Sequence, residues 1–171
     1  MESDSSLLLS IGSITKSHGI EGEFIVNLYS KEISFKNNIR EVWLGESLSH
    51  THSWSVTTIR KSAQSLFLTL RKINSIEEAN YLKGLNVYLP KKYILSGYIF
   101  LVDGFNFYFS HSTSALGEII EINNSGKQPF YIVSTYQDKE DNIILPAVAD
   151  LIESIDWENK DIYYKQIDGI F

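Results

Sequence analysis

The first half of the chain alternates apolar and polar residues with the period of β-strands. Residues 7–14 are apolar with a break at Gly12, and Phe24, Val26 and Leu28 then recur at every second position. Side chains two apart on a strand lie on one face, so this spacing predicts a hairpin with one buried face. Further runs rich in β-branched and aromatic residues lie at 41–44, 54–60, 66–70 and 86–89.

One short helix interrupts these strands. Ser75 is followed three residues later by Glu78, the spacing of a capping box, and Gly84 is a candidate stop signal. Pro90 ends the strand at 86–89, because proline cannot donate a hydrogen bond to a ladder. We therefore predict a first domain at residues 1–90 and a linker at 91–97.

The strand pattern restarts in the second half. Phe105, Phe107 and Phe109 recur at period two, and a single helical turn is expected between the proline at 146 and residue 151. These patterns predict a second meander at residues 98–171, so the fold class is mainly β, with two small β-barrel domains whose closure hides the strand edges. The remaining predicted strands are 116–122, 130–134, 142–145, Ile152–Asp156 and Asp161–Tyr164.

Composition narrows the classes of function. The chain of 171 residues has no cysteine, which excludes disulfides, thiolate nucleophiles and thiolate metal sites. No apolar run reaches the roughly 18 residues of a membrane span, and the start lacks the basic region of a secretory signal, so we expect a cytoplasmic protein that contacts no membrane. The net charge of -6 is opposite to that of a protein held mainly by phosphate contacts and suits a basic protein partner, although a charge of this size also serves solubility alone.

Catalytic and cofactor chemistry has little support in the sequence. His50 and His52 would share one face of a strand, yet no third metal ligand accompanies them, and His18 and His111 lie in turn-like stretches. No nucleophile elbow or phosphate-binding glycine loop is present. We therefore predict no enzyme activity, no catalytic residue, no metal and no cofactor.

Two stretches of the first half carry the pattern of a known family. The sequence IGSITKSHGIEGE at residues 11–23 resembles the opening of RimM proteins, in which a strand leads into a His-Gly turn and then a Gly and an acid. His18, Gly19, Gly22 and Glu23 make up this structural turn motif, and its glycines allow backbone conformations closed to other residues. EANYLKGLNVYLP at residues 78–90 is similar to the family's helix, Lys-Gly, strand and Pro.

The second half continues the resemblance. Residues 115–119 (ALGEI), 143–146 (IILP) and 155–162 (IDWENKDI) are similar to family motifs in the same order, so the likeness spans nearly the whole chain. It implies an amino-terminal barrel related to translation-factor β-domains and a carboxy-terminal PRC barrel. It also implies a ribosome assembly chaperone.

The resemblance further implies a partner. In RimM proteins the chaperone binds free small ribosomal subunits, contacts ribosomal protein number nineteen of the small subunit, and promotes 16S rRNA processing and maturation of the subunit head. An aromatic pair that opens the PRC barrel makes the contact in relatives. The corresponding residues here are Tyr98 and Phe100, although Ile99 and the stretch 102–104 depart from the family pattern. We expect a monomer.

Two other classes of function stay open at this point. A β-barrel module could contact ribosomal RNA directly, with Phe105, Phe107 and Phe109 as a stacking platform, although period-two Phe is the ordinary pattern of a barrel core. An enzyme such as a flavin-using barrel is the third class, because fold alone does not fix function. A steep salt dependence of RNA binding would favour the RNA-binding module, and a yellow colour of the purified protein would favour the flavin enzyme.

Overall fold

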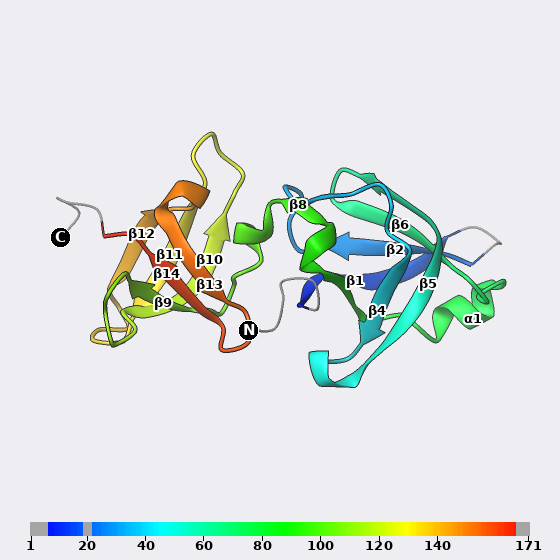
Figure 1. Cartoon of the computed structure of the whole chain (residues 1–171), viewed down its shortest axis with the longest axis horizontal. Coiled ribbons are helices and arrows are strands. Elements are labelled where there is room, and N and C mark those ends of the chain that lie inside the picture. Colours follow the sequence, from blue (N-terminus) through cyan, green and yellow to red (C-terminus); the bar gives the residue numbers. More distant parts are fainter. Residues whose placement is uncertain (1–6, 19–21, 167–171) are drawn as a thin grey trace. The chain divides into compact units, whose positions relative to one another are not determined.

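The protein is mainly β and divides into two compact units, residues 1–97 and 98–171. The computed structural model describes residues 7–18 and 22–166, and Figure 1 shows a separate sheet in each unit. The mainly β prediction is thereby confirmed and two barrel-like domains are consistent with these sheets, but of the two six-stranded sheets the first closes on itself and the second keeps two edge strands.

The first unit is a closed six-stranded barrel in the order β1-β2-β6-β5-β4-β7. Closure leaves no strand edge in this sheet, because β7 pairs antiparallel with both β1 and β4. Its strands are β1 (Leu8–His18), β2 (Glu23–Leu28), β4 (Glu41–Gly45), β5 (Thr51–Ser62), β6 (Ser65–Leu70) and β7 (Asn86–Pro90), and the short 3-10 helix η1 (Leu48–His50) joins β4 to β5.

The barrel core follows the period-two pattern of the sequence. Phe24, Val26 and Leu28 of β2 are fully buried, and so are Leu66 and Leu68 of β6, which pairs with β2. Burial of each such side chain contributes about 1.5–3 kcal/mol relative to exposure. The predicted hairpin with one buried face is confirmed.

The one α-helix of the described residues, α1 (Ile76–Asn80), begins where the capping box was predicted. The Ser75 hydroxyl accepts a hydrogen bond from the Glu78 backbone N–H. The Glu78 carboxylate accepts one in return from the backbone N–H of Asn74, at 2.8 Å, where a capping box would use that of Ser75. The helix ends at Asn80, and Gly84, at φ +88°, lies four residues beyond its end.

The segment at 91–97, predicted as a linker, is built onto the first unit. It forms the 3-10 helix η2 (Lys91–Tyr93) and β8 (Ile94–Ser96), and β8 pairs with β3 (Ser34–Phe35). Gly97 follows at φ +82°, and a Cβ atom there would lie 2.5 Å from the carbonyl oxygen of Glu32. Glycine is therefore needed at this position for both conformation and space.

The second unit holds a six-stranded sheet in the order β12-β11-β10-β9-β14-β13. The predicted meander is wrong in one respect: β9 pairs in parallel with β14, so the sheet is mixed. The strands are β9 (Asn106–Phe109), β10 (Gly117–Asn123), β11 (Phe130–Thr135), β12 (Asn142–Pro146), β13 (Ile152–Asp156) and β14 (Asp161–Tyr164), with 3-10 helices η3 (Tyr98–Phe100) and η4 (Ala149–Leu151).

Aromatic residues dominate the core of the second unit. Phe107, Tyr131 and Tyr164 are fully buried, Phe105 is nearly so, and Phe109 packs against the same cluster. The Tyr164 hydroxyl donates a hydrogen bond of 2.9 Å to the Pro146 carbonyl, which satisfies a polar group inside the core. The period-two Phe run is thus a core pattern and not a stacking platform.

Candidate partner-binding site

The His-Gly turn lies at one end of the β1–β2 pair. His18 ends β1 with its ring edge-on to Phe67, at 5.9 Å between centroids, and Glu23 begins β2, opposite His18 in the register. Gly22 has φ +71°, the conformation predicted for the motif. Gly19 lies outside the described residues. Within them, the motif residues do not converge on a catalytic arrangement.

The predicted partner-binding residues lie at the start of the second unit. Tyr98 and Phe100 begin and end η3, and both are half-buried. The Tyr98 ring lies edge-on to Trp157 at 6.5 Å, and Trp157 in turn lies 5.5 Å from Phe105. Phe100 packs on the core instead. We call Tyr98, Phe100 and Trp157 the aromatic cluster.

Trp157, whose ring lies against Tyr98, was not among the residues predicted from the sequence. It lies within the IDWENKDI motif, directly after β13, and nothing in its local pattern distinguishes a site residue from a core residue. Its partner Tyr98 lies 59 positions earlier in the numbering of the chain. Only the folded unit brings the two rings together.

A buried tyrosine fixes η3 to the core. The Tyr131 hydroxyl donates a hydrogen bond of 2.8 Å to the carbonyl of Ile99, the buried middle residue of η3. Burial, with smaller contributions from Tyr164 and Tyr98, raises the pKa of Tyr131 above its ordinary value, so this hydroxyl keeps its proton. The aromatic cluster is therefore held in place before any partner binds.

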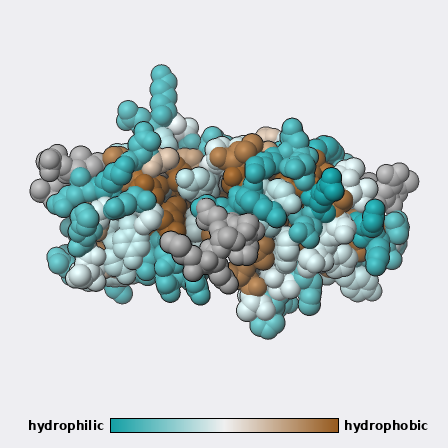
Figure 2. Space-filling model, in the orientation of Figure 1, coloured by the Kyte–Doolittle hydropathy of each residue, from teal (hydrophilic) through white to brown (hydrophobic). Residues whose placement is uncertain are grey.

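Charge is divided unequally between the two units. Residues 1–97 carry eleven Lys and Arg against nine Asp and Glu, a net +2, whereas residues 98–171 carry four against twelve, a net -8. Figure 2 shows that hydrophilic residues cover most of the visible face and that apolar residues form smaller patches. The acidity of the chain is thus a property of its second unit.

Tyrosines and carboxylates share the outer face of the second sheet. The Tyr108 and Tyr163 rings stack at 5.0 Å from the paired strands β9 and β14. The Tyr136 hydroxyl donates to the Asn106 side-chain oxygen at 2.6 Å, and the Asn106 amide donates to Asp161 at 2.9 Å. We call these five residues the tyrosine face. Their hydrogen bonds fix the ring and carboxylate positions.

Carboxylates on and near the tyrosine face have no ion-pair partner within the described residues. In the part of the chain that the structure describes, the only ion pair joins Arg60 to Glu23 in the first unit, so Glu118, Asp156 and Asp161 have no ion-pair partner. Hydrogen bonds from the backbone and side chain of Asn159 lower the pKa of Asp156, which stays charged. A cationic partner would find these charges available.

The histidines show no metal site. His50 lies in η1 with its Nδ1 atom 3.0 Å from the Ser49 hydroxyl, and His111 has φ +70° in a turn. Among residues 7–18 and 22–166, no group of three or more His, Asp or Glu side chains could hold a metal ion. None of the helices in that part of the chain is long and apolar enough to span a membrane.

Comparison with known proteins identifies the family. Residues 9–93 match the model of the RimM N-terminal domain. The chain is 22% identical to ribosome maturation factor RimM of Thermoanaerobacter sp. over 165 residues, covering 94% of this chain and 96% of that protein. It is 26% identical to ribosome maturation factor RimM of Clostridium botulinum (strain Langeland), with 94% of each covered.

A solved structure is also similar. The crystal structure of a 16S ribosomal RNA processing protein RimM from Pseudomonas aeruginosa aligns with a TM-score of 0.43 and 20% identity, covering 94% of this chain and 98% of that one. The matched domain and the full-length relatives agree with the motifs at residues 11–23 and 78–90. The chain belongs to the RimM family.

Proposed function

We propose that this chain is a ribosome maturation factor that acts as a non-enzymatic assembly chaperone in the cytoplasm. It binds ribosomal protein number nineteen on free small subunits, as a monomer, and so promotes 16S rRNA processing and maturation of the subunit head. Family membership and the names of the full-length relatives support the general role. The aromatic cluster beside an acidic face supports the choice of a basic protein partner.

The aromatic cluster is the observation that carries the proposal. Half-exposed aromatic rings on a fixed support are typical anchors of protein interfaces, because they bury much area at little entropic cost. Tyr98 is the best placed of the three, since Phe100 and Trp157 also pack on the core. Its support is rigid because Tyr131 bonds the carbonyl of Ile99.

Charge would steer the partner to this surface. Asp156 immediately precedes Trp157 in the chain, so the acidic end of β13 adjoins the aromatic cluster. Complementary potentials accelerate encounter and reject partners of the wrong sign. Arginine side chains of a basic protein can also lie on tyrosine rings, which the stacked Tyr108 and Tyr163 offer.

The chaperone needs no bond-making step. A protein that binds one assembly state more tightly than another shifts the population toward it by that difference in affinity. Release follows when contacts of the mature subunit compete for the same surface. Two separate units, residues 1–97 and 98–171, would allow the first to contact rRNA while the second holds the protein.

The test is calorimetric titration with purified ribosomal protein number nineteen. We expect Tyr98→Ala to weaken binding by about 2 kcal/mol, or roughly 30-fold, as an interface anchor does. Tyr81→Ala is the matched control, because Tyr81 is 87% exposed in the first unit. The Tyr98→Ala, Phe100→Ala double variant should lose more, provided that it is folded.

Three outcomes separate the hypotheses. Loss of binding in Tyr98→Ala but not in Tyr81→Ala supports both the partner and the site. Tight binding that neither variant weakens keeps the partner and removes the site. No binding by the unaltered protein at low salt overturns the proposed partner, and direct rRNA binding then becomes the leading function.

A further inference from the structure

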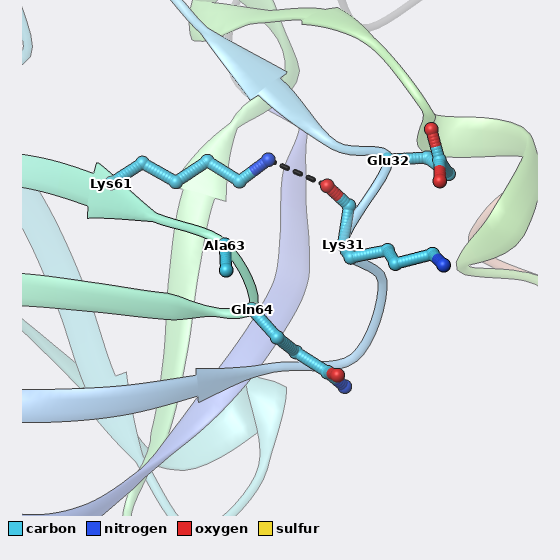
Figure 3. A pocket seen from close by; sticks show the side chains of 5 residues that line it. All are labelled: Lys31, Glu32, Lys61, Ala63 and Gln64. Atoms are coloured by element: carbon cyan, nitrogen blue, oxygen red, sulfur yellow. Dashed lines mark hydrogen bonds between the residues drawn. The ribbon is translucent and has the colours of Figure 1, made fainter.

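A pocket of about 500 Å³ lies on the first unit, whereas the residues of the proposed protein site belong to the second unit. It lies between the loop that follows β2 and the tip of the β5–β6 hairpin. Figure 3 shows Lys31 and Glu32 on the loop side, with Lys61 and Gln64 reaching toward it from the hairpin. Ala63 completes the lining.

The hairpin wall is fixed to the end of β2. The Leu28 backbone N–H donates to the Gln64 carbonyl at 2.9 Å, and the Gln64 side-chain amide donates to the Leu28 carbonyl at 3.2 Å. Ser62 and Ser65 pair at the hairpin end, which leaves Ala63 and Gln64 as its two-residue turn. Ala63 adopts φ +50°, a costly conformation for a residue with a Cβ atom.

The loop wall is anchored on both sides. Ser30 is 2% exposed and Ile33 is fully buried, so the two residues between them, Lys31 and Glu32, are presented on a short and well-held span. The Lys61 ammonium donates a hydrogen bond of 2.6 Å to the Lys31 carbonyl and joins the two walls directly. The pocket is therefore organised before it is occupied.

Both lysines keep binding capacity. An ammonium group has three donors, and Lys61 uses one of them on the Lys31 carbonyl. Neither Lys31 nor Lys61 forms an ion pair within the described residues. Glu32 is the one acid of the lining, and its side chain projects on the opposite side of the loop from Gln64 in Figure 3. Two lysine side chains that form no ion pair within the described residues thus line the pocket, and the Lys61 ammonium is held by its bond to the Lys31 carbonyl.

We propose that this pocket binds a phosphate group of an RNA backbone, held by the ammonium groups of Lys31 and Lys61. A phosphate carries the acceptor oxygens that two ammonium donors require, and lysine binds it as a point charge. The net +2 of residues 1–97, against -8 for residues 98–171, makes the first unit the favoured side for a polyanion. The choice of RNA among phosphate sources rests on the proposed function.

The test measures the affinity of the full chain for a fluorescein-labelled oligouridine by anisotropy across a salt series. We expect Lys31→Gln, Lys61→Gln to bind about tenfold more weakly at low salt, with a salt slope shallower by about 0.7, the value for one lost phosphate contact on a single strand. Lys31→Glu alone retains the Lys61 bond to the loop and should weaken binding at least as much.

The matched control is Lys16→Gln, Lys83→Gln, which removes the same charge elsewhere on the first unit. Lys16 pairs with Ile25 on the side of the barrel toward α1, whereas the pocket adjoins Leu28, and Lys83 follows α1. If this control weakens RNA binding as much as the pocket variant does, the contact is diffuse attraction and the proposed site is wrong.

Two further measurements distinguish the source of phosphate and the fate of the proposed function. Inorganic phosphate and uridine monophosphate are titrated separately; binding of either as tight as that of oligouridine would overturn an RNA-backbone site. The pocket variant should bind ribosomal protein number nineteen with unchanged affinity, and Tyr98→Ala should keep its affinity for oligouridine. Failure of one proposal therefore leaves the other measurable.

Discussion

The two units are similar in size and both are β-rich, yet they differ in closure and in surface chemistry. The first is a closed barrel with net +2, and it carries a lysine-lined pocket between the loop after β2 and the tip of the β5–β6 hairpin. The second is a mixed sheet with two edges and net -8, and it presents tyrosines and carboxylates that form no ion pair within residues 98–166. The contrast teaches that a shared architecture leaves the choice of partner to the outward-facing residues.

The largest effect is expected from removing one buried aromatic ring from each core in turn, which tests whether the two units unfold independently. Phe107→Ala and Phe24→Ala each remove a fully buried ring, one from each unit. We expect each to cost about 3–5 kcal/mol of the free energy of unfolding, through lost burial and a cavity. The measurement is denaturant unfolding followed by amide signals assigned to each unit. Equal losses in both units from either variant would show that the cores are not independent.

Alkaline pH should lower the free energy of unfolding of the second unit through its buried Tyr164, with a smaller effect than the core substitutions. Burial raises the pKa of Tyr164 to about 12, from 10 in the unfolded chain. The folded state then holds a proton that the unfolded state loses, so the free energy of unfolding is complete below pH 10 and falls as pH rises toward 12. Tyr164→Phe should make the fall of the unfolding free energy with pH shallower, by an amount equivalent to the uptake or release of at most one proton on unfolding.

The control for the pH series is Tyr81→Phe, which alters an exposed ring of the first unit. Its slope should match that of the unaltered protein. Unfolding at several pH values between 9 and 12 gives the slopes directly. An identical slope in Tyr164→Phe would mean that this hydroxyl does not titrate with unfolding.

The smallest effect concerns the hairpin tip of the first unit. Ala63→Gly should stabilise the protein by about 0.5–1 kcal/mol, because glycine adopts positive φ without the steric cost paid by alanine. Ala149→Gly, at an exposed position of η4 in the second unit, should destabilise it slightly. Thermal unfolding compares the two, and destabilisation by Ala63→Gly would contradict the assigned strain.

The local pattern of apolar and polar residues predicted most of the strands, because a strand with one buried face has apolar residues at every second position. Phe24, Val26 and Leu28, and the capping residues Ser75 and Glu78, lie as predicted. Pairing between distant segments was not predictable in the same way. The parallel β9–β14 pair and the β3–β8 pair depend on contacts that leave no periodic mark on either strand.

The candidate sites divide in the same manner. Tyr98 and Phe100 came from resemblance to the family, and their role in binding stays a prediction. Trp157 lies against Tyr98 only through the fold. Lys31 and Lys61 lie 30 positions apart and belong to no motif, so their shared pocket is visible only in the structure. Surface chemistry assembled from distant loops has no local signature.

The pairing of β1 with β7 sets an order on synthesis of the chain. The first unit cannot close its barrel until Asn86–Pro90 has emerged, because that strand completes the ladder beside Leu8–His18. The same holds for the second unit, because β9 pairs with β14, which is synthesised after all the other strands of its sheet. Both sheets therefore stay incomplete until their last strands have been synthesised. Until then the strand that lacks its neighbour is exposed to pairing with other chains.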